Sequence, residues 1–391
     1  MSDIYLDVSR IIWRNSTGRM PTGIDRICLA YLEHYRSRAK AVIQHNGRRL
    51  ILSTLLSQEL FQMLLNREAH VKRRIASIIA RALLHRQVHQ GADPAIYLNV
   101  GHTGLEQPGL SEWARKVNLR PVMLVADLIP ITHPEFCRPG EKRKHESRMT
   151  SLLEAGAGVI GISHDTLNEL QRFATDIGLP MPPALAAHIG IDDRPFMAAD
   201  LSDAPIQKPY FVVLGTIEGR KNHMLILNIW RELVSRYQDK APQLIVIGQR
   251  GWECEQVVDM LERCEALRDH VTELPRVSDE EVSRYLRHAR ALLFPSFVEG
   301  YGMPLVEALA LGTPVLASNL GVFRELVGAI PEYFSPIDGA RWMDAIMDYA
   351  ASDGFRRSGQ LARMAHYHAP TWAGHFSLVD DWLEQNFGKP A

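Results

Sequence analysis

The stretch "ARALLFPSFVEGYGMPLVEALALGTPVLAS", residues 289 to 318, places a glycine-rich loop and a helix-forming segment between two apolar runs. Pro304 suits the first turn of a helix, where its missing N–H is not needed, and Gly312 is a natural stop. The apolar runs at 289–296 and 313–318 are typical of short buried strands. The order strand, loop, helix, strand predicts one unit of a parallel α/β sheet.

Two glutamates stand out in this stretch. Glu299 opens the loop at the carboxyl end of the expected strand, where open α/β sheets bind ligands. Glu307 lies inside an apolar run, where a carboxylate needs a partner, and a ribose diol can donate two hydrogen bonds to one carboxylate. An alternative stays open, in which Glu307 only favours the positive end of the helix and Glu299 is a solvated loop residue.

A second loop of the same kind lies in "VVLGTIEGRKNHMLIL", residues 212 to 227. Arg220 and Lys221 fall at the start of the expected helix, and two cations beside free N–H groups suit a diphosphate. The amides of 300–303, at the start of the other helix, would also bind an anion. The alternative is a solvated basic pair. Because a parallel sheet brings both loops to one edge, the two together predict a nucleotide-sugar site; the sequence GxGxxG is absent, which disfavours a dehydrogenase.

The bulk composition indicates two globular domains without a nucleic-acid surface. The chain has 391 residues and a net charge of −1, with 44 basic and 45 acidic residues. Its four cysteines form no CxxC pair, so neither a zinc site nor a disulfide framework is indicated. The N-terminus lacks a signal-peptide core and no apolar run reaches the length of a membrane span, so we expect a cytoplasmic protein.

Apolar patterning predicts an alternation of strands and helices on both sides of a linker at 180–209. Strands are expected at 3–13, 40–46, 95–101, 121–131, 156–163, 210–216, 242–248, 289–296 and 313–318. Helices are expected at 22–35, 164–178, 222–237, 279–289, 304–311 and 371–387, with a helical pattern across 50–90. The prediction is an α/β protein with two doubly wound domains in tandem.

These motifs resemble the retaining glycosyltransferases of family 4, in a mannosyltransferase-like branch. Glu299 and Glu307 match the pattern E-x7-E, "GTIEGRKN" resembles its signature GT-x-E-P-R-K-N, and "VIGQRGW" resembles G-x-x-GW. The segments 275–309 and 127–136 are similar to two further stretches of that branch. The resemblance implies a GT-B fold, with two Rossmann-like domains facing a cleft. The implied domains are an acceptor-binding domain at 1–195, a nucleotide-sugar-binding domain at 196–375, and a final helix at 376–391 packing back on the first domain.

The resemblance also implies roles for residues at matching positions. Glu299 would hold hydroxyls of the donor sugar, Glu307 the ribose, and Arg220 and Lys221 the diphosphate; the catalytic set is Glu299, Lys221, Arg220 and His133. The donor-binding set is Glu307, Gly215, Thr216, Gly300, Tyr301, Gly302, Met303, Pro304, Leu305, Arg276, Val277 and Asp127.

The sequence departs from the family pattern at two positions. Thr216 stands where many members have Arg, which leaves more of the diphosphate charge to Arg220 and Lys221. Ala126 stands where relatives often have His, so an amino-domain histidine role would pass to His133 or His102, or be absent. A lone histidine near a strand end is more often a structural group than a catalytic one.

By resemblance, the reaction moves a hexose, with mannose favoured, from a nucleotide diphosphate sugar to a saccharide acceptor with retention. GDP-mannose is the favoured donor and a UDP-sugar is next; the acceptor would be linked to a polyprenyl diphosphate, as in surface polysaccharide synthesis. No cofactor and no metal are expected, since no DxD triplet occurs. The alternatives are a nucleotide-sugar epimerase or phosphorylase of similar fold, and a non-catalytic scaffold.

Residues 69 to 92, "AHVKRRIASIIARALLHRQVHQGA", contain no acid and five Lys or Arg. At helical spacing, one stripe holds Val71, Ile75, Ile78, Ile79 and Ala82. Arg73, Arg74 and Arg81 lie broadly opposite, and Lys72 and Arg86 flank the stripe. One interpretation is a core-facing helix with a solvated basic side. The other is an interfacial helix that docks on anionic lipid at the inner face of the cytoplasmic membrane.

Overall fold

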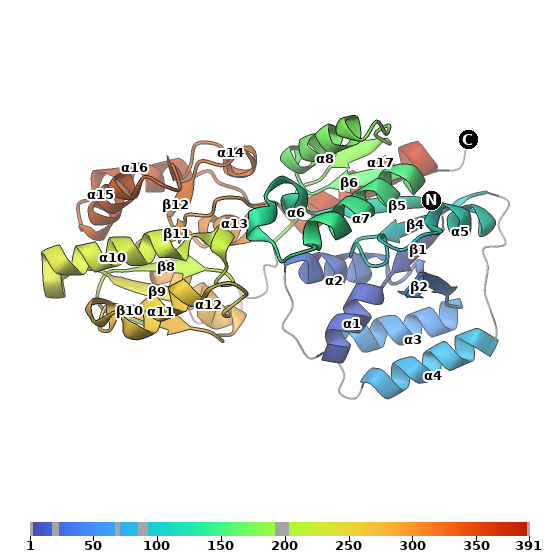
Figure 1. Cartoon of the computed structure of the whole chain (residues 1–391), viewed down its shortest axis with the longest axis horizontal. Helices are drawn as coiled ribbons and strands as arrows, with labels where there is room; N and C mark the ends of the chain where they lie inside the picture. The colour runs from blue at the N-terminus through green and yellow to red at the C-terminus, as the bar shows by residue number, and fades with distance from the viewer. Residues whose placement is uncertain (1–2, 18–22, 67–70, 85–92, 192–202, 389–391) are drawn as a thin grey trace. The chain divides into compact units, whose positions relative to one another are not determined.

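The computed structural model describes residues 3–17, 23–66, 71–84, 93–191 and 203–388 (Figure 1). The chain divides into two compact units. The first unit contains Met1–Thr132, Pro139–Ile189 and Trp372–Ala391, and the second contains His133–Arg138 and Gly190–Thr371. The sequence boundaries at 195 and 375 therefore differ from the structural ones by a few residues, and the short segment His133–Arg138 groups with the second unit rather than the first.

The first unit is built on a seven-stranded sheet with the order β3-β2-β1-β4-β5-β6-β7, in which all neighbours are parallel except β3 against β2. A mostly parallel sheet needs cover on both faces, and the strands β1 and β4 are accordingly buried at every residue. Its strands are β1 (Ile4–Asp7), β2 (Ala39–His45), β3 (Arg48–Ile51), β4 (Ala95–Asn99), β5 (Leu119–Val125), β6 (Gly158–Gly161) and β7 (Ala184–Ala186).

Helices pack on this sheet through their apolar stripes. The core of the unit joins Tyr5, Tyr97 and Met123 from the sheet with Leu152 and Leu170 from helices. The helices of the unit are α1 (Ser9–Thr17), α2 (Gly23–Tyr35), α3 (Thr54–Leu65), α4 (Val71–Leu84), α5 (Leu110–Lys116), α6 (Ile129–Thr132), α7 (Glu141–Ala155), α8 (His164–Asp176) and α17 (Trp372–Phe387).

The last helix, α17, returns to the first unit, as the sequence predicted. The hydroxyl of Tyr31 on α2 lies 2.8 Å from Nε2 of His375 on α17. The hydroxyl of Tyr35 donates to Asp380 at 2.8 Å, and Arg38 donates to the same carboxylate at 2.7 Å. These buried and partly buried contacts hold α17 against α2 and the residues that follow it.

The second unit is built on a six-stranded sheet with the order β10-β9-β8-β11-β12-β13, parallel throughout. Trp230 and Trp342 are fully buried in its core, one on each of two helices. Its strands are β8 (Tyr210–Leu214), β9 (Gln243–Ile247), β10 (Val271–Leu274), β11 (Leu292–Phe294), β12 (Val315–Ser318) and β13 (Glu332–Phe334). Its helical elements are η1 (Pro134–Phe136), η2 (Gly219–Lys221), α10 (His223–Tyr237), η3 (Gln238–Lys240), α11 (Glu255–Arg263), η4 (Glu265–Leu267), α12 (Asp279–His288), α13 (Met303–Ala310), α14 (Gly321–Val327), α15 (Gly339–Ala350) and α16 (Phe355–Met364).

Several sequence predictions about individual elements were wrong in their extent. The strand expected at 3–13 ends at Asp7, because the Asp7 carboxylate accepts the N–H of Ser9 at 3.0 Å and α1 begins there. The strand expected at 121–131 ends at Val125, and the Asp127 carboxylate accepts the N–H of Ile129 in the turn that leads into α6. The linker expected at 180–209 contains β7, which pairs with β6. Two helices fill most of the described part of 50–90, but β3 occupies its start.

None of the helices in the described ranges is both long and apolar enough to cross a membrane.

Candidate active site

The second unit brings two loops together at the carboxyl edge of its sheet, where β8 and β11 are neighbours. One loop follows β8 and holds Arg220 and Lys221 in the turn η2. The other follows β11 and holds Glu299. Between them, the backbone N–H of Phe297 donates to the carbonyl of Arg220 at 2.8 Å. Residues almost eighty positions apart therefore share one site, as the two-loop prediction required.

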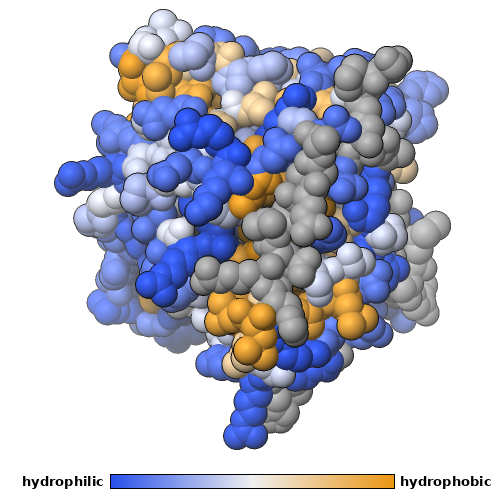
Figure 2. All heavy atoms as spheres, turned by 90° about the vertical axis from the view of Figure 1, so that its right-hand side faces the viewer, coloured by the Kyte–Doolittle hydropathy of each residue, from blue (hydrophilic) through white to orange (hydrophobic). Residues whose placement is uncertain are grey.

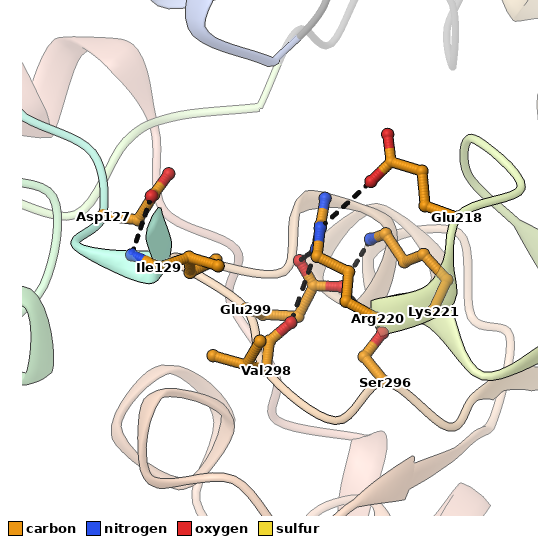
Figure 3. A network of polar contacts seen from close by, with 8 residues as sticks. All are labelled: Asp127, Ile129, Glu218, Arg220, Lys221, Ser296, Val298 and Glu299. Carbon is orange, nitrogen blue, oxygen red and sulfur yellow. Dashed lines mark hydrogen bonds and ion pairs between the residues drawn. The ribbon is translucent and has the colours of Figure 1, made fainter. Parts of the chain in front are cut away.

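Glu299 is the centre of a polar cluster. Its side chain is 7% exposed, and its carboxylate lies beside both cations (Figure 3). Nη1 of Arg220 donates to Oε2 at 2.8 Å, and Nζ of Lys221 donates to Oε1. The hydroxyl of Ser296 also donates to Oε1, at 2.7 Å. Both carboxylate oxygens are thus bound to charged donors.

The turn that carries the cations is fixed by Asn222. This residue adopts a left-handed conformation with φ of 57°, which asparagine tolerates better than most residues. Its side-chain amide donates to the carbonyl of Pro336 at 2.7 Å and to that of Pro295 at 3.2 Å. The amide therefore ties the cation turn to the segment that precedes Glu299.

The charges of the cluster shift one another's protonation. Burial alone would raise the pKa of Glu299, but Arg220 and Lys221 beside it lower that pKa to about 2. Burial lowers the pKa of Lys221, and the neighbouring Glu299 opposes that shift. Nζ of Lys221 also lies 4.9 Å from the ring centroid of Phe294, a cation–π contact that favours the charged form. We therefore treat the pair as ionised at neutral pH.

Gly302 shapes the start of α13. Its φ of +108° is a backbone conformation that residues other than glycine rarely adopt, and a Cβ at this position would lie 2.7 Å from the Phe323 ring. The N–H of Leu305 donates to the carbonyl of Gly302 at 3.0 Å. This hydrogen bond closes the first turn of α13, and Leu305 stays a predicted donor-binding residue.

The other predicted donor residues lie around the same edge. Glu307 lies half-buried on α13, one turn after Pro304, and Tyr301 is buried. Gly215 directly follows β8 with φ of +141°, and Thr216 after it is exposed. Further donor positions are Gly300 and Met303 in the Glu299 loop, and Arg276 and Val277 between β10 and α12.

The histidines and Asp127 are placed differently. His133 precedes η1 and stacks on Phe136 at 6.4 Å between centroids. His102 is buried and Nε2 of its ring donates to the carbonyl of Leu124 at 2.6 Å, and burial lowers its pKa to about 3. His102 is therefore a neutral structural group. Asp127 lies in the first unit, where its carboxylate accepts from Ile129 at 3.1 Å. Within the part of the chain that the structure describes, no cluster of three His, Cys, Asp or Glu could hold a metal ion.

Sequence reasoning missed three residues of the cluster. Ser296 and Asn222 hold Glu299 and the cation turn, and Glu218 accepts from Nε of Arg220 at 3.2 Å. Glu218 and Asn222 both lie inside the quoted motif "GTIEGRKN", and Ser296 lies three residues before Glu299, so adjacency to the predicted residues was the available signal.

Comparison with known proteins identifies related chains. The family model described as "Glycosyl transferases group 1" matches residues 201–330. A protein named O-antigen chain mannosyltransferase B from Escherichia coli is 30% identical over 260 residues, covering 65% of this chain and 67% of that protein. The serotype-specific mannosyltransferase WbdA of Escherichia coli is 27% identical over 225 residues. This chain spans about a quarter of the length of that relative, since the match covers 27% of it.

Solved structures show the same fold at low sequence identity. Anabaena HepE, solved in complex with UDP, matches with a TM-score of 0.67 and 16% identity over 98% of this chain and 100% of that one. Sucrose-phosphate synthase from Thermosynechococcus elongatus matches with a TM-score of 0.63 and 15% identity, covering 99% of each chain. The predicted GT-B fold is thereby confirmed.

Proposed function

Because this chain belongs to the group 1 glycosyl transferases, we propose that it transfers a hexose from a nucleotide diphosphate sugar to a saccharide acceptor with retention of anomeric configuration. The observation that carries the proposal is the Glu299 carboxylate held between Arg220 and Lys221 at the carboxyl edge of a parallel sheet. Cations for a diphosphate and a carboxylate for sugar hydroxyls then lie within one hydrogen bond of each other.

The favoured donor is GDP-mannose. Relatives named as mannosyltransferases support mannose as the transferred sugar. A UDP-sugar is the second candidate, supported by the complexes of HepE with UDP and with UDP-glucose. In either case Glu307 would bind the ribose, and the loop around Arg276 and Val277 would contact the base.

The proposed chemistry uses a front-face path. The acceptor hydroxyl approaches the anomeric carbon on the face from which the diphosphate leaves, the new C–O bond forms as the old one breaks, and the acceptor proton passes to the leaving phosphate oxygen. Arg220 and Lys221 would stabilise the charge that develops on that oxygen. Charge stabilisation by fixed groups is usually the largest contribution in such sites. His133 stays a candidate for the catalytic histidine role that relatives place in the amino domain. We propose that neither metal nor cofactor takes part.

We propose a polyprenyl-diphosphate-linked saccharide as the acceptor, in surface polysaccharide synthesis at the cytoplasmic face of the membrane. Relatives named for the O-antigen chain support this class of product. Such an acceptor would bring the enzyme to an anionic surface, so the basic helix α4 is the candidate contact.

The structure narrows how α4 could reach a membrane. Ile75, Ile78 and Ala82 of its apolar stripe are buried, so that stripe faces the core of the first unit and is not available to enter lipid. Its basic residues Lys72, Arg73, Arg74 and Arg81 are exposed, and Arg81 pairs with Glu59 of α3 at 2.6 Å. Arg86 lies outside the described residues.

The carboxyl end of α4 adds an apolar contribution. Leu83 and Leu84 are 53% and 78% exposed there. The face of the molecule that Figure 2 presents carries hydrophobic side chains in separate patches among hydrophilic ones. We therefore propose that α4 docks on the anionic membrane through its basic residues and these two leucines. Its apolar stripe would not enter the lipid.

The direct test of the function is transfer by the purified protein. The purified protein is incubated with labelled GDP-mannose or UDP-sugars, with and without lipid-linked acceptor from a membrane extract. Release of nucleoside diphosphate and transfer of label to the acceptor are measured. Label transfer, or slow donor hydrolysis without acceptor, supports the proposal. Isomerisation of free donor without acceptor would point to an epimerase, and absence of both reactions in protein that binds nucleotide would point to a scaffold.

A further inference from the structure

The diphosphate site of the second unit is neutralised by its own carboxylates. Arg220 donates through Nε to Glu218 at 3.2 Å and through Nη1 to Glu299 at 2.8 Å. Lys221 donates to the other oxygen of Glu299. Two positive and two negative side chains thus face one another, and a diphosphate that enters must take cations already bound to carboxylates.

The exchange is most costly at Glu299, because it is the more buried of the two carboxylates. Its side chain is 7% exposed, whereas that of Glu218 is 20% exposed. A buried carboxylate that loses its cations without new partners suffers the full cost of an unpaired buried charge. Water replaces the lost partner more easily at Glu218.

We propose, on the basis of the proposed function, that Glu299 determines the preference for the nucleotide sugar over the nucleoside diphosphate product. When the donor binds, its phosphates take Arg220 and Lys221, and its sugar hydroxyls donate to the Glu299 carboxylate. When the product remains, the phosphates still attract the cations, but no sugar hydroxyl replaces them at Glu299. The carboxylate then competes with the diphosphate for the cations and weakens product binding.

Loss of a simple binding contact weakens ligand affinity, whereas loss of this competing carboxylate should strengthen it. Glu299→Gln keeps an oxygen that accepts hydrogen bonds but removes the charge that holds the cations. The variant should therefore bind the bare nucleoside diphosphate more tightly than the wild type. It should gain less for the nucleotide sugar, since a neutral amide oxygen is a weaker acceptor for sugar hydroxyls than a carboxylate.

The experiment is isothermal calorimetry with GDP, UDP and GDP-mannose on the full chain. For Glu299→Gln we expect GDP or UDP affinity to rise about tenfold or more, the range of coupling measured for close charge pairs, and the ratio of donor to product affinity to fall. Unchanged or weaker binding of the diphosphate by a folded Glu299→Gln variant overturns the inference.

Two further variants make the test specific. Glu218→Gln should tighten GDP and GDP-mannose by similar, smaller factors, because Glu218 holds Arg220 without facing the sugar. Glu255→Gln, an exposed position on α11, is the matched control for losing one negative charge and should change neither affinity. If Glu299→Gln does not fold, as judged by its melting transition, the absence of any tightening in Glu218→Gln overturns the inference. Wild-type protein that binds neither GDP nor UDP contradicts the proposed function itself, whereas binding without tightening contradicts this inference alone.

Discussion

Asp7 in the first unit and Glu299 in the second are both buried carboxylates at the carboxyl edge of a parallel sheet, yet their surroundings shift them in opposite directions. Burial raises the pKa of Asp7 to about 6, partly offset by hydrogen bonds from Tyr97, Ser9 and Gln44. Glu299 is buried too, but two cations lower its pKa to about 2. The difference shows that the same sheet position yields a structural group or a charged site, depending on the loops that supply its partners.

The neighbours of Asp7 are committed to one another. The hydroxyl of Tyr97 donates to Asp7 at 2.8 Å, and Gln44 donates to the same oxygen at 2.7 Å. Asn99 in turn donates to Tyr97 at 3.1 Å. These are neutral donors within the core of the first unit, whereas Glu299 is bound by two cations, which under the proposed function would bind a diphosphate.

The largest expected effect tests whether the Glu299 site of the second unit is catalytic. Lys221→Ala should lower turnover by roughly 10²–10³-fold, which is the usual loss when one fixed charge-stabilising group is removed. Initial rates of nucleoside diphosphate release with saturating donor measure it. Lys240→Ala, at an exposed position of η3 in the same unit, is the matched control. Unchanged turnover in a folded Lys221→Ala variant would remove this lysine from the site.

The two glutamates of the E-x7-E pattern should separate binding from turnover. Glu307→Ala should weaken binding of the bare nucleoside diphosphate, by about tenfold for loss of a charged hydrogen bond, because ribose contacts are the same in ground and transition states. Glu299→Gln should lower turnover without weakening binding of the bare diphosphate, because sugar contacts can strengthen in the transition state. Calorimetry with the diphosphate measures binding, and steady-state rates measure turnover. Equal loss of diphosphate affinity in both variants would contradict the assignment of binding to Glu307 and of turnover to Glu299.

The sequence predicted the second unit better than the first, for a physical reason. In the second unit the signals are local: apolar runs set the strands, and the cations and glutamates lie in short loops between recognisable elements. The pairing of Glu299 with both cations was not predicted, because each had been given a separate ligand and they are almost eighty residues apart.

In the first unit the decisive contacts are non-local. Asp7, Gln44 and Tyr97 meet only because β1 lies between β2 and β4 in the sheet. The short strands β3 and β7 also depend on pairing with a neighbour rather than on a strong apolar run of their own. Patterning along the chain could not reveal either feature.

The Asp7 side of the comparison predicts a pH-dependent stability. A carboxyl whose pKa is raised on folding binds its proton more tightly in the folded state, so stability is lost as pH rises from about 4, near the unfolded value, to the folded value of about 6. Above that window the ionised Asp7 costs about 2–3 kcal/mol. Asp7→Asn should therefore be more stable than wild type at pH 8 and similar at pH 4, measured by urea unfolding. An equal difference at both pH values would exclude this linkage.

Glu299 should behave in the opposite way. Its depressed pKa means that its contribution to stability is present above the usual carboxyl range and is lost only as pH falls toward about 2. Glu299→Gln should therefore show no change in its stability relative to wild type between pH 5 and pH 8. This variant is the control for the Asp7 measurement.

The outward charges of the first unit give a smaller effect. We expect the protein to bind vesicles that contain anionic lipid, since each basic residue near such a surface contributes about 1 kcal/mol. Changing Arg73, Arg74 and Arg81 to Glu should weaken that binding, as should added salt. Flotation measures both. A matched variant with three exposed basic residues of the second unit changed to Glu, Arg236, Arg263 and Arg341, should bind as wild type does. Absence of vesicle binding at low salt would favour a soluble acceptor.

The smallest expected effect is that of metal removal. Under the proposed function, Arg220 and Lys221 would supply the positive charge that a divalent ion supplies in other phosphate sites. Both donate hydrogen bonds to the Glu299 carboxylate. We therefore expect donor hydrolysis and transfer to continue at the same rate in excess EDTA. Rates are compared before and after dialysis against EDTA, with Lys221→Ala measured in parallel. Complete loss of activity that magnesium or manganese restores would show that Arg220 and Lys221 do not suffice. The site in the second unit would then need a bound divalent ion.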